Sequence, residues 1–242
     1  MPQGLGGGNI SAAGELERLN EEIIACVRCP RLVQHRKEVA ERRPLRFRDW
    51  MYWARPLPGF GDPRARLLIL GLAPAAHGGN RTGRMFTGDR SGDWLFRALH
   101  QFRFANQARS VHREDGLALQ DAYLTATIRC APPQNKPLPS EIRSCRPYLL
   151  RELHLLSSAK ILVALGRIAF DVALHALEEA FALSVSPKPG FGHGRVFLLP
   201  KGLTLIASYH PSQQNTQTGR LTWKMFDEVF AKARGILIKG GT

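Results

Sequence analysis

Four continuous apolar runs, each followed by a segment of helical periodicity, limit the fold of this 242-residue chain more than any other feature. The runs read RLLILG, AYLTATIR, KILVALG and LTLIASY, at 66–71, 122–129, 160–166 and 203–209. A strand that is apolar throughout must be covered on both faces, which is typical of parallel sheets with crossover helices on either side. The pattern predicts an α/β fold, a three-layer α/β/α sandwich around a mostly parallel four-stranded sheet.

The helices follow from periodicity and capping residues. Ser11 suits the N-cap of a helix that extends to Cys29 and that Pro30 ends, and Ser140 suits the N-cap of a helix through about residue 157. Residues 30–65 are basic and rich in aromatics and proline, which predicts an irregular surface segment. The other predictions are helices at 92–104, 167–183 and 221–235, an edge strand within 192–200, and a loose tail at 1–10. We expect one domain over 1–242.

The segments that leave the carboxyl ends of the four strands point to a single site. They are 71–90, 130–139, 166–168 and 210–220, and three of them are rich in Gly, Pro, Asn and other polar residues. Ligands of open α/β sheets bind outside the carboxyl ends of the strands. His210, which follows the last strand, is expected at this edge beside the 71–90 loop, although a lone histidine is more often structural than catalytic.

The net charge of +14 indicates a polyanionic partner. Lys and Arg number 34 against 20 Asp and Glu, and residues 28–66 alone hold eleven basic and four acidic residues. A solubilising surface would explain a global excess of positive charge. The local concentration favours binding to phosphates, which is driven by counterion release.

The glycine-rich loop GLAPAAHGGNRTGR at 71–84 resembles a phosphate-binding loop but lacks its chemistry. Gly78 and Gly83 have the Walker spacing, yet Arg84 and Met85 stand where Lys and Ser or Thr are required. No G-x-G-x-x-G follows the strand either. The loop is therefore not expected to bind ATP or NAD.

Four cysteines form a candidate metal site: Cys26, Cys29, Cys130 and Cys145. Four thiolates suit zinc or an iron–sulfur cluster, although zinc usually prefers two closely spaced pairs and only one is present. A redox C-x-x-C motif would need no further partners. The spacing also permits four buried, unpaired cysteines.

Several motifs in order resemble the uracil-DNA glycosylase superfamily, and most closely its family 5, also called type b. They are PLPGFGD at 56–62, GLAPAAHGGNRTGRMFTGD at 71–89, TATIRCAPPQNKP at 125–137, VALGRIA at 163–169 and SYHPSQQNTQTGRLT at 208–222. The resemblance covers nearly the whole chain. It implies the same α/β/α sandwich, and it implies a structural [4Fe–4S] cluster, because the four cysteines fall on the ligand pattern of the family.

The resemblance also implies a pocket that receives a base extruded from DNA. Phe86 falls on the position that stacks the base, Gly71 permits a close backbone approach, and the wall is expected to include Ala73 and Pro74. His210 is the expected donor to the departing, anionic base.

The sequence departs from related families at two places, one that positions the attacking water and one that recognises the base. Leu72 and Ala73 stand where other families place a polar residue that positions the attacking water, so Asp89 and Asn135 are the expected catalytic residues in its place. Ala126 stands where a sister family has an Asn that reads uracil. The loss of that amide predicts a wider range of bases, including hypoxanthine.

The remaining expected contacts are with DNA. The loop QQNTQTGR matches the segment that enters the duplex beside the lesion, so we expect Gln214, Asn215 and Arg220 to bind DNA. Arg81 and Arg84 are candidates for phosphate contacts, although solvation at the surface would explain them nearly as well.

The sequence thus predicts a monofunctional DNA glycosylase of base-excision repair that hydrolytically removes uracil, and hypoxanthine or other deaminated bases, and leaves an abasic site. Two alternatives are a glycosylase with a different main substrate base and an iron–sulfur protein that binds lesions without releasing the base. No secretory signal or membrane span is evident, which predicts a cytoplasmic protein, and we expect a monomer whose partner is damaged DNA.

Overall fold

The computed structural model describes residues 11–240, and the tail expected at 1–10 lies outside the described residues. Within them the chain forms a six-stranded sheet of order β1-β3-β2-β4-β6-β5. The inner strands are all parallel: β3 (Ala122–Ala126), β2 (Leu67–Gly71), β4 (Ile161–Leu165) and β6 (Thr204–Ser208). The four predicted core strands are confirmed. Antiparallel strands β1 (Phe60–Gly61) and β5 (Val196–Leu198) add one short strand to each edge.

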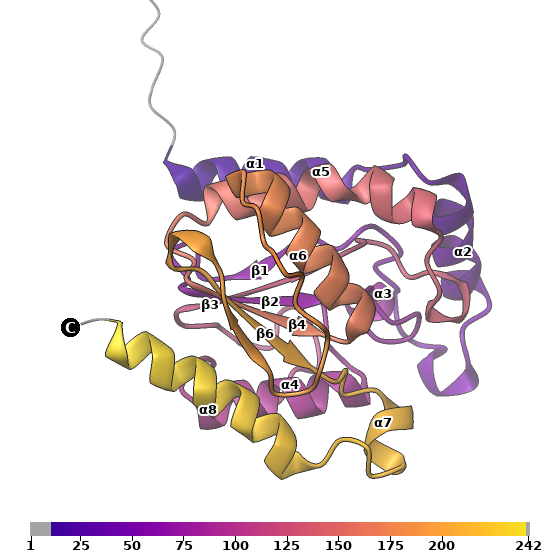
Figure 1. The fold of residues 1–242 in the computed structure, drawn as a ribbon. Helices are drawn as coiled ribbons and strands as arrows, with labels where there is room; N and C mark the ends of the chain where they lie inside the picture. The colour runs from indigo at the N-terminus through magenta and orange to yellow at the C-terminus, as the bar shows by residue number, and fades with distance from the viewer. Residues whose placement is uncertain (1–10, 241–242) are drawn as a thin grey trace, which may run out of the picture.

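Helices cover both faces of the sheet, as the three-layer prediction requires (Figure 1). One face packs against α1 (Ala12–Ile24), α5 (Pro139–Leu155) and α6 (Arg167–Phe181), and the other packs against α4 (Arg90–Gln101) and α8 (Trp223–Lys239). Alternate residues of a strand point into the two hydrophobic cores. In β2, Leu68 and Leu70 pack in the core under α1, α5 and α6, and Leu67 and Ile69 pack in the core under α4 and α8. No helix within residues 11–240 is long and apolar enough to cross a bilayer.

The prediction that Pro30 ends a helix was wrong. The first helix ends at Ile24, and Pro30 is instead the first residue of α2 (Pro30–Glu41), with Cys29 as its N-cap. Proline suits the first helical position because its missing N–H is not needed there and its φ is already helical. The predicted irregular segment at 30–65 therefore begins with a helix, and only its remainder is mostly irregular.

Ser140 does not cap α5, because the helix begins at Pro139, with Leu138 as its N-cap, and Ser140 is its second residue. The Glu141 side chain accepts the Leu138 N–H at 2.7 Å and so fulfils the capping role. Several short elements were not predicted: the helices α3 (Gly79–Thr82) and α7 (Gln213–Gln217), and the 3-10 helices η1 (Leu45–Phe47), η2 (Pro133–Asn135) and η3 (Pro200–Gly202).

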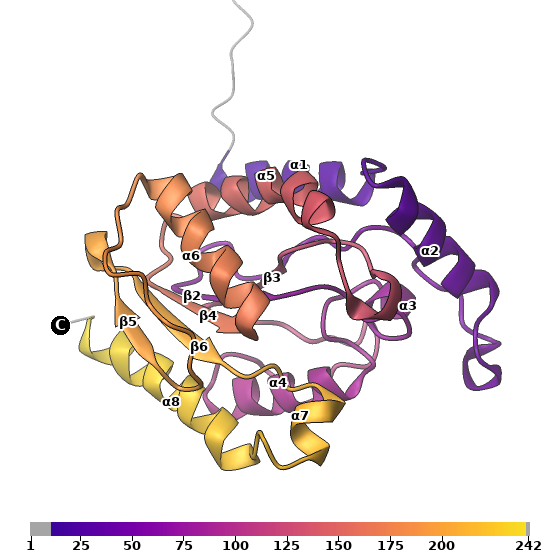
Figure 2. The same cartoon turned by 45° about the vertical axis from the view of Figure 1, so that its right-hand side comes forward.

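Three of the short elements, α3, η2 and α7, lie in loops that follow parallel strands. Figure 2 shows α3 and α7 at the end of the molecule toward which β4 and β6 point. The loops that follow β2, β3 and β6 contain these elements, so the sheet places them beside one another.

Candidate functional site

A cavity of about 640 Å³ lies at the carboxyl edge of the sheet. Its wall comes from the 71–90, 130–139 and 210–220 loops together with the end of β3, so the predicted convergence of these loops is observed. The lining residues are Leu72, Ala73, Pro74, Ala75, Met85, Phe86, Asp89, Arg90, Ser91, Ala126, Gln134, Asn135, His210, Ser212, Gln213 and Gln214.

Phe86 forms an aromatic wall of the cavity, and two glycines hold it in place. Its ring lies over Gly71, where a Cβ would approach the ring to 2.8 Å. Behind it, a Cβ on Gly92 would meet the Phe86 carbonyl oxygen at 1.8 Å. Phe86 itself adopts φ +52°, a left-handed conformation that is rare for an aromatic residue. The close approach expected of Gly71 is therefore an approach to the ring of Phe86.

His210 lies beside Phe86 in the cavity wall, with ring centroids 5.8 Å apart and ring planes tilted by 30°. It follows β6 directly, and the Asn215 side chain donates to its backbone carbonyl at 2.8 Å, which ties the histidine to α7. The surrounding protein desolvates the imidazole and lowers the pKa of His210 to about 4. The ring is therefore neutral near pH 7 and carries one N–H donor.

Asp89 lines the cavity, and its two carboxylate oxygens have different surroundings. Its Oδ1 accepts the Gly92 N–H at 3.0 Å and caps α4. Its Oδ2 lies 2.1 Å from where a Cβ of Gly78 would be, so only glycine fits at that position. Burial raises the pKa of the Asp89 carboxyl above its ordinary value.

Asn135 and Gln134 form the rim of the cavity on the loop after β3. Both residues have positive φ, +57° and +53°, which turns the chain sharply within η2. Both are exposed, in contrast to Ala126, which is buried at the end of β3. Gln134 was not predicted as a site residue, and its place beside Asn135 in the same polar loop was the available signal.

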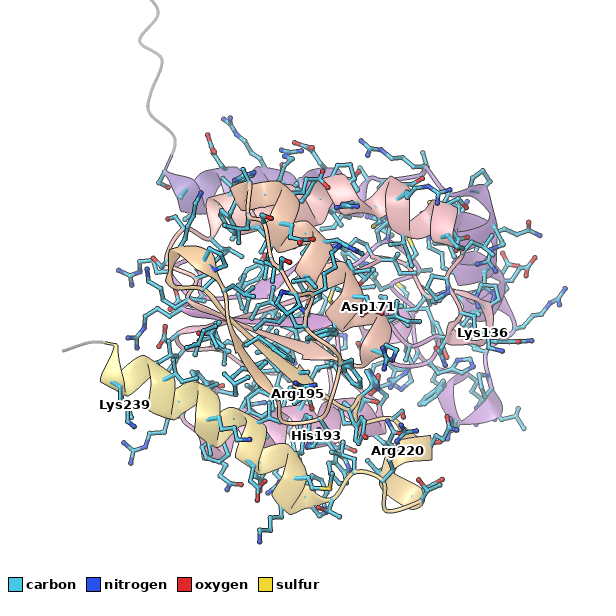
Figure 3. All side chains as sticks on the ribbon, viewed as in Figure 1. Lys136, Asp171, His193, Arg195, Arg220 and Lys239 are labelled. Carbon is cyan, nitrogen blue, oxygen red and sulfur yellow. The ribbon has the colours of Figure 1, made fainter. Side chains whose placement is uncertain are left out.

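The expected DNA-binding residues of the last loop are divided between two neighbouring cavities. Gln214 is exposed on α7 and lines the first cavity. Asn215 and Arg220 line a second cavity of about 390 Å³, which shares His210 with the first. Figure 3 shows Arg220 beside α7, and its guanidinium stacks 4.7 Å from the Tyr209 ring. Arg167, at the start of α6, also lines this cavity and was not predicted.

The placement of Arg81 and Arg84 does not support the predicted phosphate contacts. The two residues are only 5% and 4% exposed. Arg81 donates to the carbonyls of His77 and Gly88, at 2.7 and 3.0 Å. Arg84 pairs with Asp115 at 2.7 Å. Both guanidinium groups are used inside the protein, so their role is to hold the 71–90 loop together.

The four cysteines are free and line one small cavity, of about 20 Å³, at the start of α2 and alongside α5. Burial raises the pKa of Cys130 to about 11 and that of Cys145 to about 12. The Arg36 Nη1 donates to the Cys130 Sγ at 3.1 Å, a bond that favours the thiolate. Glu141, the carboxylate in this cavity, is bound by Arg31. The available donors are therefore sulfurs, which suits a metal with thiolate ligands.

The arrangement of the cysteines differs from a site for a single ion. Within residues 11–240, no group of three or more His, Cys, Asp or Glu side chains surrounds one ion position. The ligands of an iron–sulfur cluster are spaced more widely, because each thiolate binds a different iron atom. A shared cavity with sulfur donors and a cationic neighbour fits such a cluster better than it fits zinc.

Comparison with known proteins identifies relatives over most of the chain. A family model described as "Uracil DNA glycosylase superfamily" matches residues 58–234. A "Type-5 uracil-DNA glycosylase" of Thermus thermophilus is 52% identical over 218 residues, which cover 90% of this chain and 96% of that protein. One of Mycobacterium tuberculosis is 52% identical over 223 residues, with 92% and 82% coverage. A "Type-4 uracil-DNA glycosylase" of Sulfurisphaera tokodaii is 25% identical over 224 residues, with 92% and 85% coverage.

Proposed function

Because the chain belongs to the uracil DNA glycosylase superfamily, we propose that it is a uracil-DNA glycosylase, a hydrolase that cleaves the N-glycosidic bond of uracil in DNA. The observation that carries this proposal is the cavity in which a neutral His210 lies beside the ring of Phe86. An extruded base is planar and carries hydrogen-bonding groups on its edge, so an aromatic wall beside a donor suits it.

The chemistry follows from where charge develops. As the bond between the base and C1′ breaks, its electron pair leaves with the base, and negative charge spreads to the base oxygens. His210 lines this cavity, and we propose that its N–H donates to such an oxygen and stabilises the charge. A water oxygen then bonds to C1′ of the cation-like sugar and releases a proton. Asp89 is the candidate acceptor of that proton, because burial raises its pKa.

The lining of the cavity supports a wider range of bases than uracil alone. Ala126 lines the cavity at the position where the resemblance implies an Asn in a sister family, and Ala73 and Pro74 are also apolar. An apolar wall rejects analogues less strongly than a hydrogen-bonding one. We therefore include hypoxanthine and other deaminated bases among the proposed substrates.

The test is release of bases from a panel of duplexes that carry uracil, hypoxanthine, xanthine or ethenocytosine opposite each normal base. We expect free uracil and, at a lower rate, free hypoxanthine, with the abasic strand left intact until it is cleaved by alkali. If another base is released faster than uracil, that base is the main substrate. Strand cleavage without alkali would contradict the monofunctional mechanism.

A second candidate is a protein that binds lesions without releasing the base. It is favoured by Leu72 and Ala73, which present no polar side chain for water at one wall of the cavity. Under this alternative, the parent chain and His210→Ala bind lesion-containing DNA equally well, and neither releases a base. Base release by the parent chain, with none by His210→Ala, excludes this alternative.

Asp89→Asn and Asn135→Gly are expected to slow base release far more than they weaken DNA binding. Asn keeps the oxygen that caps α4 and removes the charge, and Gly keeps the positive φ of residue 135. Loss of a general base typically costs about 10²–10⁴-fold, so the rate at saturating enzyme is expected to fall by at least about 10²-fold for Asp89→Asn. Asp93→Asn, on an exposed position of the same helix, is the control. Unchanged rates in both variants would remove the two residues from the mechanism.

The neutral state of His210 predicts how its contribution depends on pH. Its pKa is about 4 instead of 6.5, so the folded chain stays neutral at this residue as the pH falls, while the unfolded chain takes up a proton. The folded state therefore loses stability from this group as the pH falls from 6.5 toward 4. We expect the ratio of base-release rates, parent chain to His210→Ala, to stay constant down to about pH 5. A change centred near an ordinary histidine pKa would contradict the assignment.

We also propose that Cys26, Cys29, Cys130 and Cys145 bind a [4Fe–4S] cluster. When bound, such a group supplies iron–sulfur cross-links, here between the turn before α2, the loop after β3 and α5. The cysteines lie in a different cavity from His210, so the proposed role is structural.

The purified protein is expected to be brown, with about four irons and four sulfides per chain. Cys130→Ser is expected to lose the visible absorbance and to melt at a lower temperature, because its sulfur is a proposed ligand. Ser157→Ala, an exposed position just after α5, is the control. A colourless protein that contains zinc would overturn the cluster assignment.

DNA that contains deaminated bases is thus the proposed partner. We propose further that the chain acts as a monomer in the cytoplasm, where the DNA of a bacterial or archaeal cell lies. A mass measurement in solution, with and without duplex, tests the monomer.

A further inference from the structure

A basic surface segment at residues 42–55 has no part in the site described so far. It holds five exposed arginines and one acidic residue, Asp49, and the arginines are Arg42, Arg43, Arg46, Arg48 and Arg55. It connects α2 to β1 and lies beside α3, at the same end of the molecule as α7 (Figure 2). We refer to residues 42–55 as the basic arm.

The basic arm is folded. Residues 45–47 form η1, and the Trp50 N–H donates to the Phe47 carbonyl at 3.0 Å. The Arg43 Nη1 closes the turn by donating to the Trp50 carbonyl at 3.1 Å. The backbone of the arm is therefore ordered, which reduces the entropy lost when its arginines bind a partner.

Arg81 fastens the arm to the wall of the base cavity. Its guanidinium lies between two aromatic rings of the arm, 4.1 Å from Phe47 and 4.0 Å from Trp50. The same guanidinium donates to the carbonyls of His77 and Gly88 in the 71–90 loop. Gly88 directly precedes Asp89, which lines the cavity, so a short chain of contacts joins the arm to the proposed catalytic carboxylate.

Further contacts keep the two segments in register. The Tyr52 hydroxyl is hydrogen-bonded to His77 Nδ1 at 3.0 Å, and the backbone N–H of Trp53 donates to the Arg81 carbonyl at 3.0 Å. The arm is thus attached to the 71–90 wall of the cavity, whereas α7 belongs to a different part of the wall, the 210–220 loop.

Apart from Asp49, which lies 3.5 Å from Arg48 at the surface, the exposed side chains of the arm are of two kinds. Alongside the arginines, Leu45 and Met51 are 84% and 92% exposed. A partner that suits both kinds has regularly spaced anionic groups with apolar surface between them. The backbone of DNA has this character, because its phosphates alternate with sugars.

We infer that the basic arm binds the phosphate backbone of the duplex on one side of the flipped nucleotide, the side away from α7. This inference rests on the proposed function, since it takes the cavity as the place of the flipped base. Arg46 and Arg48 are its main expected phosphate contacts, because they lie on either side of Phe47, which stacks on Arg81.

The first test compares two variants that remove the same charge. Arg46→Gln with Arg48→Gln changes the arm. As the control, Arg64→Gln with Arg103→Gln changes two exposed residues at the amino edge of the sheet, one before β2 and one after α4.

Binding is measured by fluorescence anisotropy on a labelled duplex that carries one stable abasic-site analogue. The slope of log affinity against log salt is expected to fall by about 1.8 in the arm variant, because each phosphate that an arginine neutralises adds about 0.9 to the slope. The slope of the control is expected to stay unchanged. Equal slopes in the two variants would overturn the inference.

The second test locates the contact. Hydroxyl-radical footprinting of the parent chain is expected to show protection on both sides of the abasic analogue. The arm variant is expected to lose protection on one side only. Loss on both sides, or on neither, would contradict the assignment.

These tests remain separate from the proposed function, because neither requires base release. If the parent chain binds the duplex through the arm and releases no base from any substrate, the proposed function fails and the interaction surface stands. If the parent chain releases uracil and the arm variant binds like the control, the interaction surface fails alone.

Discussion

His210→Ala is expected to slow uracil release by about 10²–10³-fold at saturating enzyme, which is the effect of removing one donor from a developing negative charge. The imidazole lies beside Phe86 in the cavity, and burial keeps it neutral, so the lost group is a single N–H. Binding to a duplex with a stable abasic analogue is expected to change little, because the analogue has no base to accept that bond. Single-turnover release and anisotropy together measure the two quantities.

A matched control for this variant is His175→Ala, which removes an exposed imidazole from α6. Full activity there and loss in His210→Ala would assign the effect to the cavity. Release by His210→Ala at the rate of the parent chain would contradict the mechanism, because no other histidine lines the cavity among residues 11–240.

Glu152→Ala is expected to have the largest effect on stability. Glu152 and Arg129 form an ion pair with side chains only 1% and 2% exposed, and the Thr125 hydroxyl donates to the same carboxylate at 2.6 Å. Removing the carboxylate leaves the Arg129 charge buried without its partner, which typically costs about 3–5 kcal/mol. In a chain of this size, a loss of that order lowers the melting temperature by about 10 °C. Scanning calorimetry measures it.

Two comparisons isolate the cause. Glu22→Ala breaks a half-exposed ion pair with Arg151 and is expected to change the melting temperature little. Arg129→Met combined with Glu152→Leu replaces the buried pair by apolar side chains of similar size and is expected to recover most of the loss. A double variant as unstable as Glu152→Ala would mean that packing, and not the unpaired charge, sets the cost.

The fold could be predicted from the sequence where burial dominates. The four inner strands are apolar throughout because helices cover both of their faces, and this leaves a continuous signal. β1 has two residues, which is too short for any periodicity to emerge. The role of Pro30 is ambiguous in the sequence, because proline is common both after helices and at their first position. Only the conformation of the following residues distinguishes a helix end from a helix start.

The site could be predicted in part for a similar reason. The parallel sheet itself brings the loops after β2, β3 and β6 together, so the convergence of Phe86, Asp89, Asn135 and His210 follows from topology. The burial of Arg81 and Arg84 does not, because arginine is usually exposed and nothing local marks a buried one. The partners that bury Arg81 are Phe47 and Trp50, which are more than thirty residues away in the sequence.

The left-handed backbone at Phe86 implies a trade-off between stability and activity. Such a conformation raises the energy of the folded state by about 1–3 kcal/mol, and the rest of the domain must compensate for it. Under the proposed function, this conformation preorganises the cavity, because the Phe86 ring is held in place before the base binds. Phe86→Gly would remove the backbone strain at this position, but it would also remove the ring. Selection for thermal stability alone would therefore favour loss of the aromatic wall.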